Sequence, residues 1–134
     1  MRFARPPPLR YFTPAEANAL LAGVRVELDA AAELGRRMKA ALESGRPRAE
    51  LMKDVERLRE EAQGHIDRIR ERGVEVKGLD VGLLDFPALR DGEMVYLCWR
   101  DGEDAIEWWH PLHTGFAGRK RIEEPESARW QWRN

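Results

Sequence analysis

The segment Ser44-Gly45-Arg46-Pro47 decides the fold, because it separates two long amphipathic stretches by a short connection. Glycine readily adopts the conformation that closes a helix, and proline cannot continue one. Upstream, Thr13-Pro14-Ala15-Glu16 has the residues of a capping box, with proline at the first helical position. We therefore predict one helix that starts at this box and ends at the segment, and a second from about Arg48 to Arg72, where Gly73 stops it.

Apolar residues recur at steps of three and four along both stretches, which is the pattern of helices that pack along one stripe. In the second stretch this seam consists of Leu51, Val55, Leu58, Ala62, His65 and Ile69. The short connection requires the two helices to run antiparallel. A hairpin of two helices leaves part of each stripe exposed, so we expect the C-terminal half or a second copy of the chain to cover it. The sequence thus predicts a homo-oligomer formed through the hairpin.

From Val74 onward the pattern changes to β-branched and aromatic residues with turn residues between them. The strands we predict are Val81–Phe86 ended by Pro87, Met94–Arg100 and Ala105–His110, with turns at Asp91-Gly92 and Asp101–Asp104. For the last two strands we favour a register that pairs odd with even positions. Leu97 then faces the core with Trp108, and Cys98 lies on the opposite face with Glu107. The other register would place Glu107 among the apolar residues.

These patterns predict an α+β fold, with a long antiparallel, coiled-coil-like two-helix hairpin followed by a small antiparallel β-sheet. We expect a single domain over residues 1–134, made of an extended arm (1–12), the hairpin (13–72), the sheet and a loop (73–122) and a tail (123–134). One cysteine, no signal peptide and no long apolar run indicate a cytoplasmic protein without a membrane segment. A net charge of −1 argues against a nucleic-acid partner.

No stretch has a recognised catalytic signature, and the sequence assigns no cofactor. His110 and His113 have an i, i+3 spacing that is compatible with one metal ion. A third ligand is not evident in the sequence, although the sheet could bring Asp85 or Glu107 close. The alternative is that both histidines only form hydrogen bonds at the end of a strand.

Two further features have a functional and a structural interpretation. Cys98 is a nucleophile if His110 acts as its base, or a small buried side chain in a strand. The segment Gly115–Arg119 has glycines and an arginine that suit an anion, or it is a structural loop whose arginine pairs with a carboxylate of the chain.

The chain resembles an uncharacterised bacterial family, domain of unknown function 2203. The resemblance rests on Tyr11–Asn18, Gly82–Pro87, Leu97–Arg100, Trp109-His110 and Gly115–Arg119. It implies no activity or substrate. The polar members of these strings, which we take as candidate ligand-binding residues, are Asp85, Arg100, His110 and Arg119. We predict that Asp85 meets His110 or His113, that Arg100 meets Glu107 or another carboxylate, and that Arg119 joins either group.

Because the strongest patterns are packing patterns, we expect a protein-interaction or self-associating module. The alternative is a small-ligand- or metal-binding protein, or an enzyme, with its site near Asp85, His110 and Arg119. The sequence leaves the nature of any small molecule open.

Overall fold

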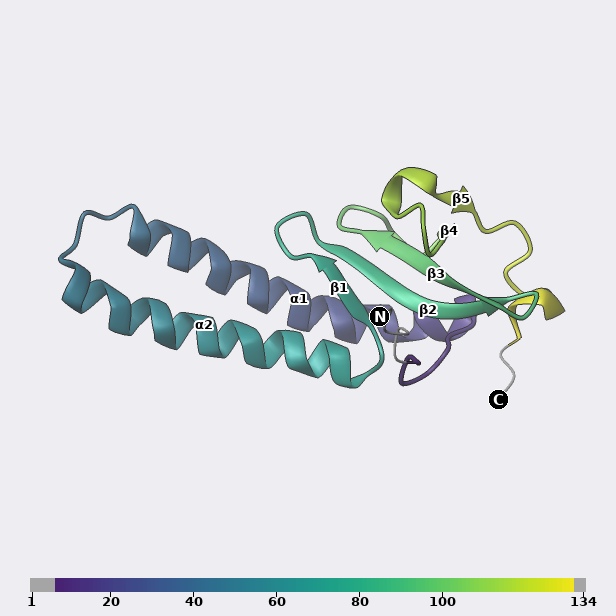
Figure 1. The fold of residues 1–134 in the computed structure, drawn as a ribbon, viewed down its shortest axis with the longest axis horizontal. Helices are drawn as coiled ribbons and strands as arrows, with labels where there is room; N and C mark the ends of the chain where they lie inside the picture. Colours follow the sequence, from purple (N-terminus) through teal and green to yellow (C-terminus); the bar gives the residue numbers. More distant parts are fainter. Residues whose placement is uncertain (1–6, 132–134) are drawn as a thin grey trace, which may run out of the picture.

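The computed structural model describes residues 7–131 and has a helical hairpin followed by a five-stranded antiparallel sheet. The α+β prediction is therefore confirmed. The elements are α1 (Pro14–Leu42), α2 (Arg48–Glu71), β1 (Glu75–Gly78), β2 (Leu83–Arg90), β3 (Glu93–Arg100), β4 (Trp108–Pro111) and β5 (Lys120–Arg121), with short 3₁₀ turns η1 (Phe116–Gly118) and η2 (Ala128–Trp130). The strands follow one another across the sheet in chain order (Figure 1).

Local signals set both ends of the hairpin. Thr13 caps α1 through its hydroxyl, which accepts from the Glu16 backbone, and the Glu16 carboxylate accepts from the Thr13 backbone at 2.9 Å. This is the predicted capping box. Gly45 has a φ of 75°, so the connection between the helices contains the left-handed residue that glycine supplies most easily.

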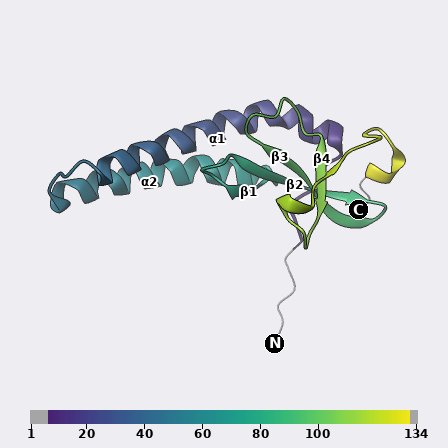
Figure 2. The ribbon, with the colours of Figure 1, turned by 90° about the horizontal axis from the view of Figure 1, so that it is seen from above.

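The main core lies between one face of the sheet and the N-terminal half of α1. Its members on α1 are Ala17, Leu21, Val24 and Leu28, and its members on the strands are Leu84, Phe86, Ala88, Val95, Leu97, Trp99 and Trp109. The other half of the hairpin projects beyond the sheet and has its own cluster of Leu34, Leu58 and Ala62 (Figures 1 and 2). The sheet therefore covers only part of the hairpin.

The N-terminal segment ends in a core anchor. Phe12 is fully buried, its ring meets Phe86 edge-on at 5.4 Å, and its backbone N–H donates to the Pro87 carbonyl at 2.7 Å. Residues 1–6 of the predicted arm and residues 132–134 of the predicted tail lie outside the described residues.

Pro87 does not end its strand, contrary to the sequence prediction, because β2 continues to Arg90. In a strand the N and C=O of one residue point to the same side. The Pro87 carbonyl points to Phe12, so the nitrogen that lacks a hydrogen also points there, away from β3. The pairing between β1 and β2 extends only to Glu75 opposite Asp85, so no residue of β1 lies opposite Pro87. The proline therefore interrupts no strand pairing on that side.

The register predicted for β3 and β4 is wrong. The observed pairs join positions of the same parity: Leu97 faces Trp109, and Tyr96 faces His110. The cause lies in α1, where Asn18 accepts from the Ile106 N–H at 2.8 Å and donates to the Ile106 carbonyl at 3.2 Å. These bonds withdraw Ile106 from the sheet, so β4 begins at Trp108 instead of Ala105.

The observed register does not place Glu107 among the apolar residues. Glu107 precedes β4 and is exposed, with Arg121 at 3.2 Å. Within residues 7–131, neither helix has the length and apolar character needed to span a membrane.

Candidate functional site

The outer face of the sheet, which faces away from the helices, carries a buried cluster of Asp85, Cys98 and His110. Asp85 on β2 is the direct partner of Cys98 on β3, and His110 on β4 is the partner of Tyr96. Cross-strand partners and alternate residues share a face, so three different strands contribute to one cluster. Asp85 and His110 are only 3% and 2% exposed, and Cys98 is fully buried.

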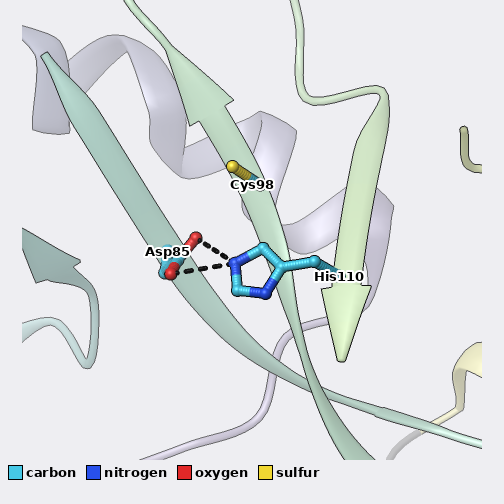
Figure 3. Close-up of side chains that lie close together, drawn as sticks. All are labelled: Asp85, Cys98 and His110. Carbon is cyan, nitrogen blue, oxygen red and sulfur yellow. Dashed lines mark hydrogen bonds and ion pairs between the residues drawn. The ribbon is translucent and has the colours of Figure 1, made fainter. Parts of the chain in front are cut away.

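The closest contact in the cluster joins His110 to Asp85. The imidazole Nε2 lies 3.0 Å and 3.1 Å from the two carboxylate oxygens (Figure 3). The other nitrogen, Nδ1, lies 2.8 Å from the Pro111 carbonyl oxygen. A carbonyl can only accept, so Nδ1 carries a hydrogen, and Nε2 of a neutral ring presents its lone pair to the carboxylate. Such a contact requires a proton or a cation between the two groups.

Burial also changes the acidity of the cluster. It raises the pKa of Asp85, while the neighbouring His110 acts in the opposite direction. It raises the pKa of Cys98 to about 12, with the Asp85 charge adding to the effect. The Cys98 thiol therefore stays protonated at neutral pH unless a cation stabilises the thiolate.

This geometry argues against Cys98 as a nucleophile with His110 as its base. A base of that kind needs one ring nitrogen for the thiol and the other for an orienting group. Here one nitrogen contacts Pro111 and the other contacts Asp85. The raised pKa of Cys98 is further evidence against a nucleophile, because a nucleophilic thiol needs a lowered pKa.

Lys77 on β1 and Tyr96 on β3 border the cluster. The Tyr96 ring lies 5.5 Å from the His110 ring, and Lys77 Nζ lies 4.8 Å from the centre of the Tyr96 ring. Lys77 also forms an ion pair with Glu75 at 2.9 Å and lowers the pKa of Asp85.

The predicted candidates do not all converge. Asp85 and His110 meet, whereas His113 is exposed and lies outside the cluster. Arg119 pairs with Glu103 at 2.5 Å, a carboxylate that also accepts from the Arg100 N–H, and lies over the same Phe116 ring as Arg100, so it joins the Arg100 side. Arg100, for which we expected a carboxylate such as Glu107, lies over the Phe116 ring at 5.5 Å.

Cys98 is the member of the cluster for which the sequence predicts a nucleophile or a small buried side chain and not a metal ligand. The feature that places it in the cluster is its cross-strand pairing with Asp85.

Comparison with known proteins adds a family but no activity. Neither a curated protein nor a solved structure matches the chain. Residues 10–122 match the family described as uncharacterized conserved protein DUF2203, and this range includes all three members of the buried cluster. The chain therefore belongs to the DUF2203 family of uncharacterized conserved proteins.

Proposed function

We propose that the protein binds a divalent transition-metal ion, with Zn²⁺ the best match, at Asp85, Cys98 and His110. The observation that supports this most directly is the proximity of the potential ligand atoms, all of which lie within 4.8 Å of one another. They are a carboxylate oxygen, a sulfur and an imidazole nitrogen, the three donor types that proteins use for zinc.

The hydrogen bond made by the other ring nitrogen of His110 also supports metal binding. A histidine that binds a metal commonly donates its other ring N–H to a backbone carbonyl, which fixes the tautomer and the ring orientation. The 2.8 Å contact between Nδ1 and the Pro111 carbonyl has this form. It leaves the lone pair of Nε2 directed at the cluster.

Charge balance also favours a divalent ion. A carboxylate, a thiolate and a neutral imidazole carry two negative charges, which one divalent cation neutralises. An unbalanced charge is costly among side chains as buried as these three, so a neutral site is the stable one.

The distances require only a small adjustment. With metal–ligand bonds of about 2.0–2.3 Å, the ligand atoms of a tetrahedral zinc site lie about 3.3–3.8 Å apart. The Nε2–carboxylate distances of 3.0 Å and 3.1 Å are just below this range, and the limit of 4.8 Å within which all three ligand atoms lie is about 1 Å above it. Three protein ligands leave one position for water or a small molecule, as in catalytic zinc sites.

The competing explanation is that Asp85 and His110 form a structural pair that needs no metal. To distinguish the two, metal-free protein is titrated with Zn²⁺ and Co²⁺, and bound metal is measured by elemental analysis. We expect one ion per chain, with a thiolate-to-cobalt charge-transfer band in the Co²⁺ form if Cys98 is a ligand. A wild-type chain that retains no metal would refute the proposal.

The chain offers a matched control for this experiment. His113→Ala removes a histidine three positions from His110 that lies outside the cluster, and should leave the stoichiometry unchanged. His110→Ala and Cys98→Ala should each weaken metal binding at least about tenfold, since each change removes a side chain that binds the metal directly. Cys98→Ala should also abolish the charge-transfer band, while circular dichroism confirms that each variant is folded.

A further inference from the structure

A separate hollow of about 210 Å³ lies on the other face of the sheet, where β2, β4, β5 and the C-terminal segment meet. Its lining includes three arginines from three different elements and two indole rings: Arg90, Arg121, Arg129, Trp109 and Trp130. Arg90 continues the inward-facing series of β2, since it follows Ala88 by two positions. The hollow is therefore distinct from the buried Asp85 cluster.

Arg90 contacts both indole rings of this hollow, and one of its nitrogens has no partner among residues 7–131. Its guanidinium carbon lies 4.4 Å from the centre of the Trp109 ring and 5.8 Å from that of Trp130. Its Nε is buried and has no hydrogen-bond partner among residues 7–131. The carboxylate of Asp91 lies 3.7 Å from one of its terminal nitrogens, which is longer than a hydrogen bond. A buried donor without an acceptor is costly, and an acceptor in the hollow would remove that cost.

We propose that this hollow binds a phosphate-sized tetrahedral oxyanion. Arg90 lines the hollow and has an unpaired Nε, and an arginine can bind two oxygens of one anion through Nε and a terminal nitrogen. Arg129 on η2 lines the hollow from another element, and Arg121 on β5 contributes to the lining while its guanidinium pairs with Glu107 at 3.2 Å. A tetrahedral oxyanion offers oxygens in several directions to such donors, whereas a carboxylate offers one edge.

The nearby acidic residues limit the affinity without removing the site. Glu123 and Glu124 also line the hollow, and both are exposed. Asp91 lies 3.6 Å from Arg129 and so shares its charge between Arg129 and Arg90. These carboxylates repel an anion, so the binding should be weak and should tighten when the two glutamates are neutralised.

The test measures binding of inorganic phosphate to the full chain by isothermal titration calorimetry, with NaCl added so that ionic strength stays constant. We expect Arg90→Gln to weaken binding at least about tenfold, because a charge-assisted contact contributes that much or more. The matched control is Arg57→Gln, an exposed arginine of α2 that pairs with Asp54 and should not change the affinity. Combined Glu123→Gln and Glu124→Gln changes should tighten binding several-fold.

A second variant keeps the test decisive if Arg90→Gln fails to fold. Arg129 is exposed, so Arg129→Gln should retain the fold and weaken phosphate binding several-fold. Equal heats for phosphate and for additional chloride at matched ionic strength would overturn the proposal. Affinity for acetate as high as that for phosphate would overturn the assignment to a tetrahedral oxyanion. Neither measurement depends on metal binding at the Asp85 cluster.

Discussion

Asn18 on α1 forms two hydrogen bonds to the backbone of Ile106, which lies 88 positions later in the chain. Its side-chain oxygen accepts from the Ile106 N–H, and its side-chain nitrogen donates to the Ile106 carbonyl. The contact joins the first helix to the segment that leads into β4. Because β4 starts two residues after Ile106, this contact also determines which residues of β4 face the outer side of the sheet, and His110 is one of them.

Replacement of Asn18 should therefore destabilise the fold. We expect Asn18→Ala to lower the free energy of unfolding by about 1–3 kcal/mol, because both backbone groups of Ile106 lose their partner. Urea denaturation measures the change. Gln63→Ala, which removes an exposed hydrogen bond to Asp67 on α2, should cost less than about 0.5 kcal/mol. Equal losses in the free energy of unfolding would show that the Asn18 contact stabilises the fold no more than an exposed hydrogen bond does.

The Cys98 thiol should be unreactive in the folded, metal-free protein. It is fully buried and its pKa is raised to about 12, so the thiolate that reacts with alkylating reagents is scarce. Iodoacetamide at pH 8 should modify denatured chains within minutes and folded chains far more slowly. Mass spectrometry reports the modified fraction. Rapid modification of the folded protein would contradict this expectation and would mean that the sheet opens readily at β3, its central strand.

Metal affinity at the proposed site should rise steeply with pH. The Cys98 thiol, with a pKa of about 12, is protonated throughout the range from pH 6 to 8, and it must lose this proton to become a ligand. Each proton released makes the apparent affinity rise about tenfold per pH unit. Competition titrations with a chelator at pH 6, 7 and 8 measure this slope. A flat profile in wild type would exclude Cys98 as a ligand.

Glu27 should make the stability of the hairpin depend on pH. Its carboxylate contacts His65 Nδ1 at 2.5 Å and Arg68 Nε at 3.1 Å, and these partners lower its pKa below 4.5. A lowered pKa means that the unfolded chain binds the proton more readily. The stabilisation is therefore present above pH 4.5 and is lost as the pH falls below it.

Glu27→Gln should accordingly cost only about 0.5–1 kcal/mol at pH 7, because Glu27 is partly exposed and Arg68 is half exposed, so water screens the pair. The difference from wild type should disappear near pH 3. Glu33→Gln on the same helix removes a much more exposed pair with Arg36 and serves as the control. A difference for Glu27→Gln that persists unchanged at pH 3 would rule out its charge as the cause.

Association through the hairpin stays a prediction. The structure already covers part of the stripe that motivated it, because Leu58 and Val55 are buried within a single chain. The large apolar residues that are exposed on the two helices are Val26, Leu42 and Met52. Light scattering coupled to gel filtration should give a multiple of 15.5 kDa. A monomeric mass at micromolar concentration in ordinary salt would refute self-association.

The sequence alone was enough to predict the hairpin, because its signals are local. The capping box involves residues three positions apart, Gly45 closes the first helix within one turn, and the seam repeats every three or four residues. The Asp91-Gly92 turn between β2 and β3 was equally predictable, since both residues have positive φ. It was also possible to predict from the sequence that Asp85 could meet His110 or His113.

Only the tertiary structure decided the register of β4 and the members of the buried cluster. The parity of β4 depends on Asn18, a residue in the first helix, and a shift of one position exchanges the two faces of a strand. Pro87 stays within β2 because Phe12 takes the place of a neighbouring strand there. Cys98 joins Asp85 and His110 only once three strands are aligned, so no spacing along the chain could show it.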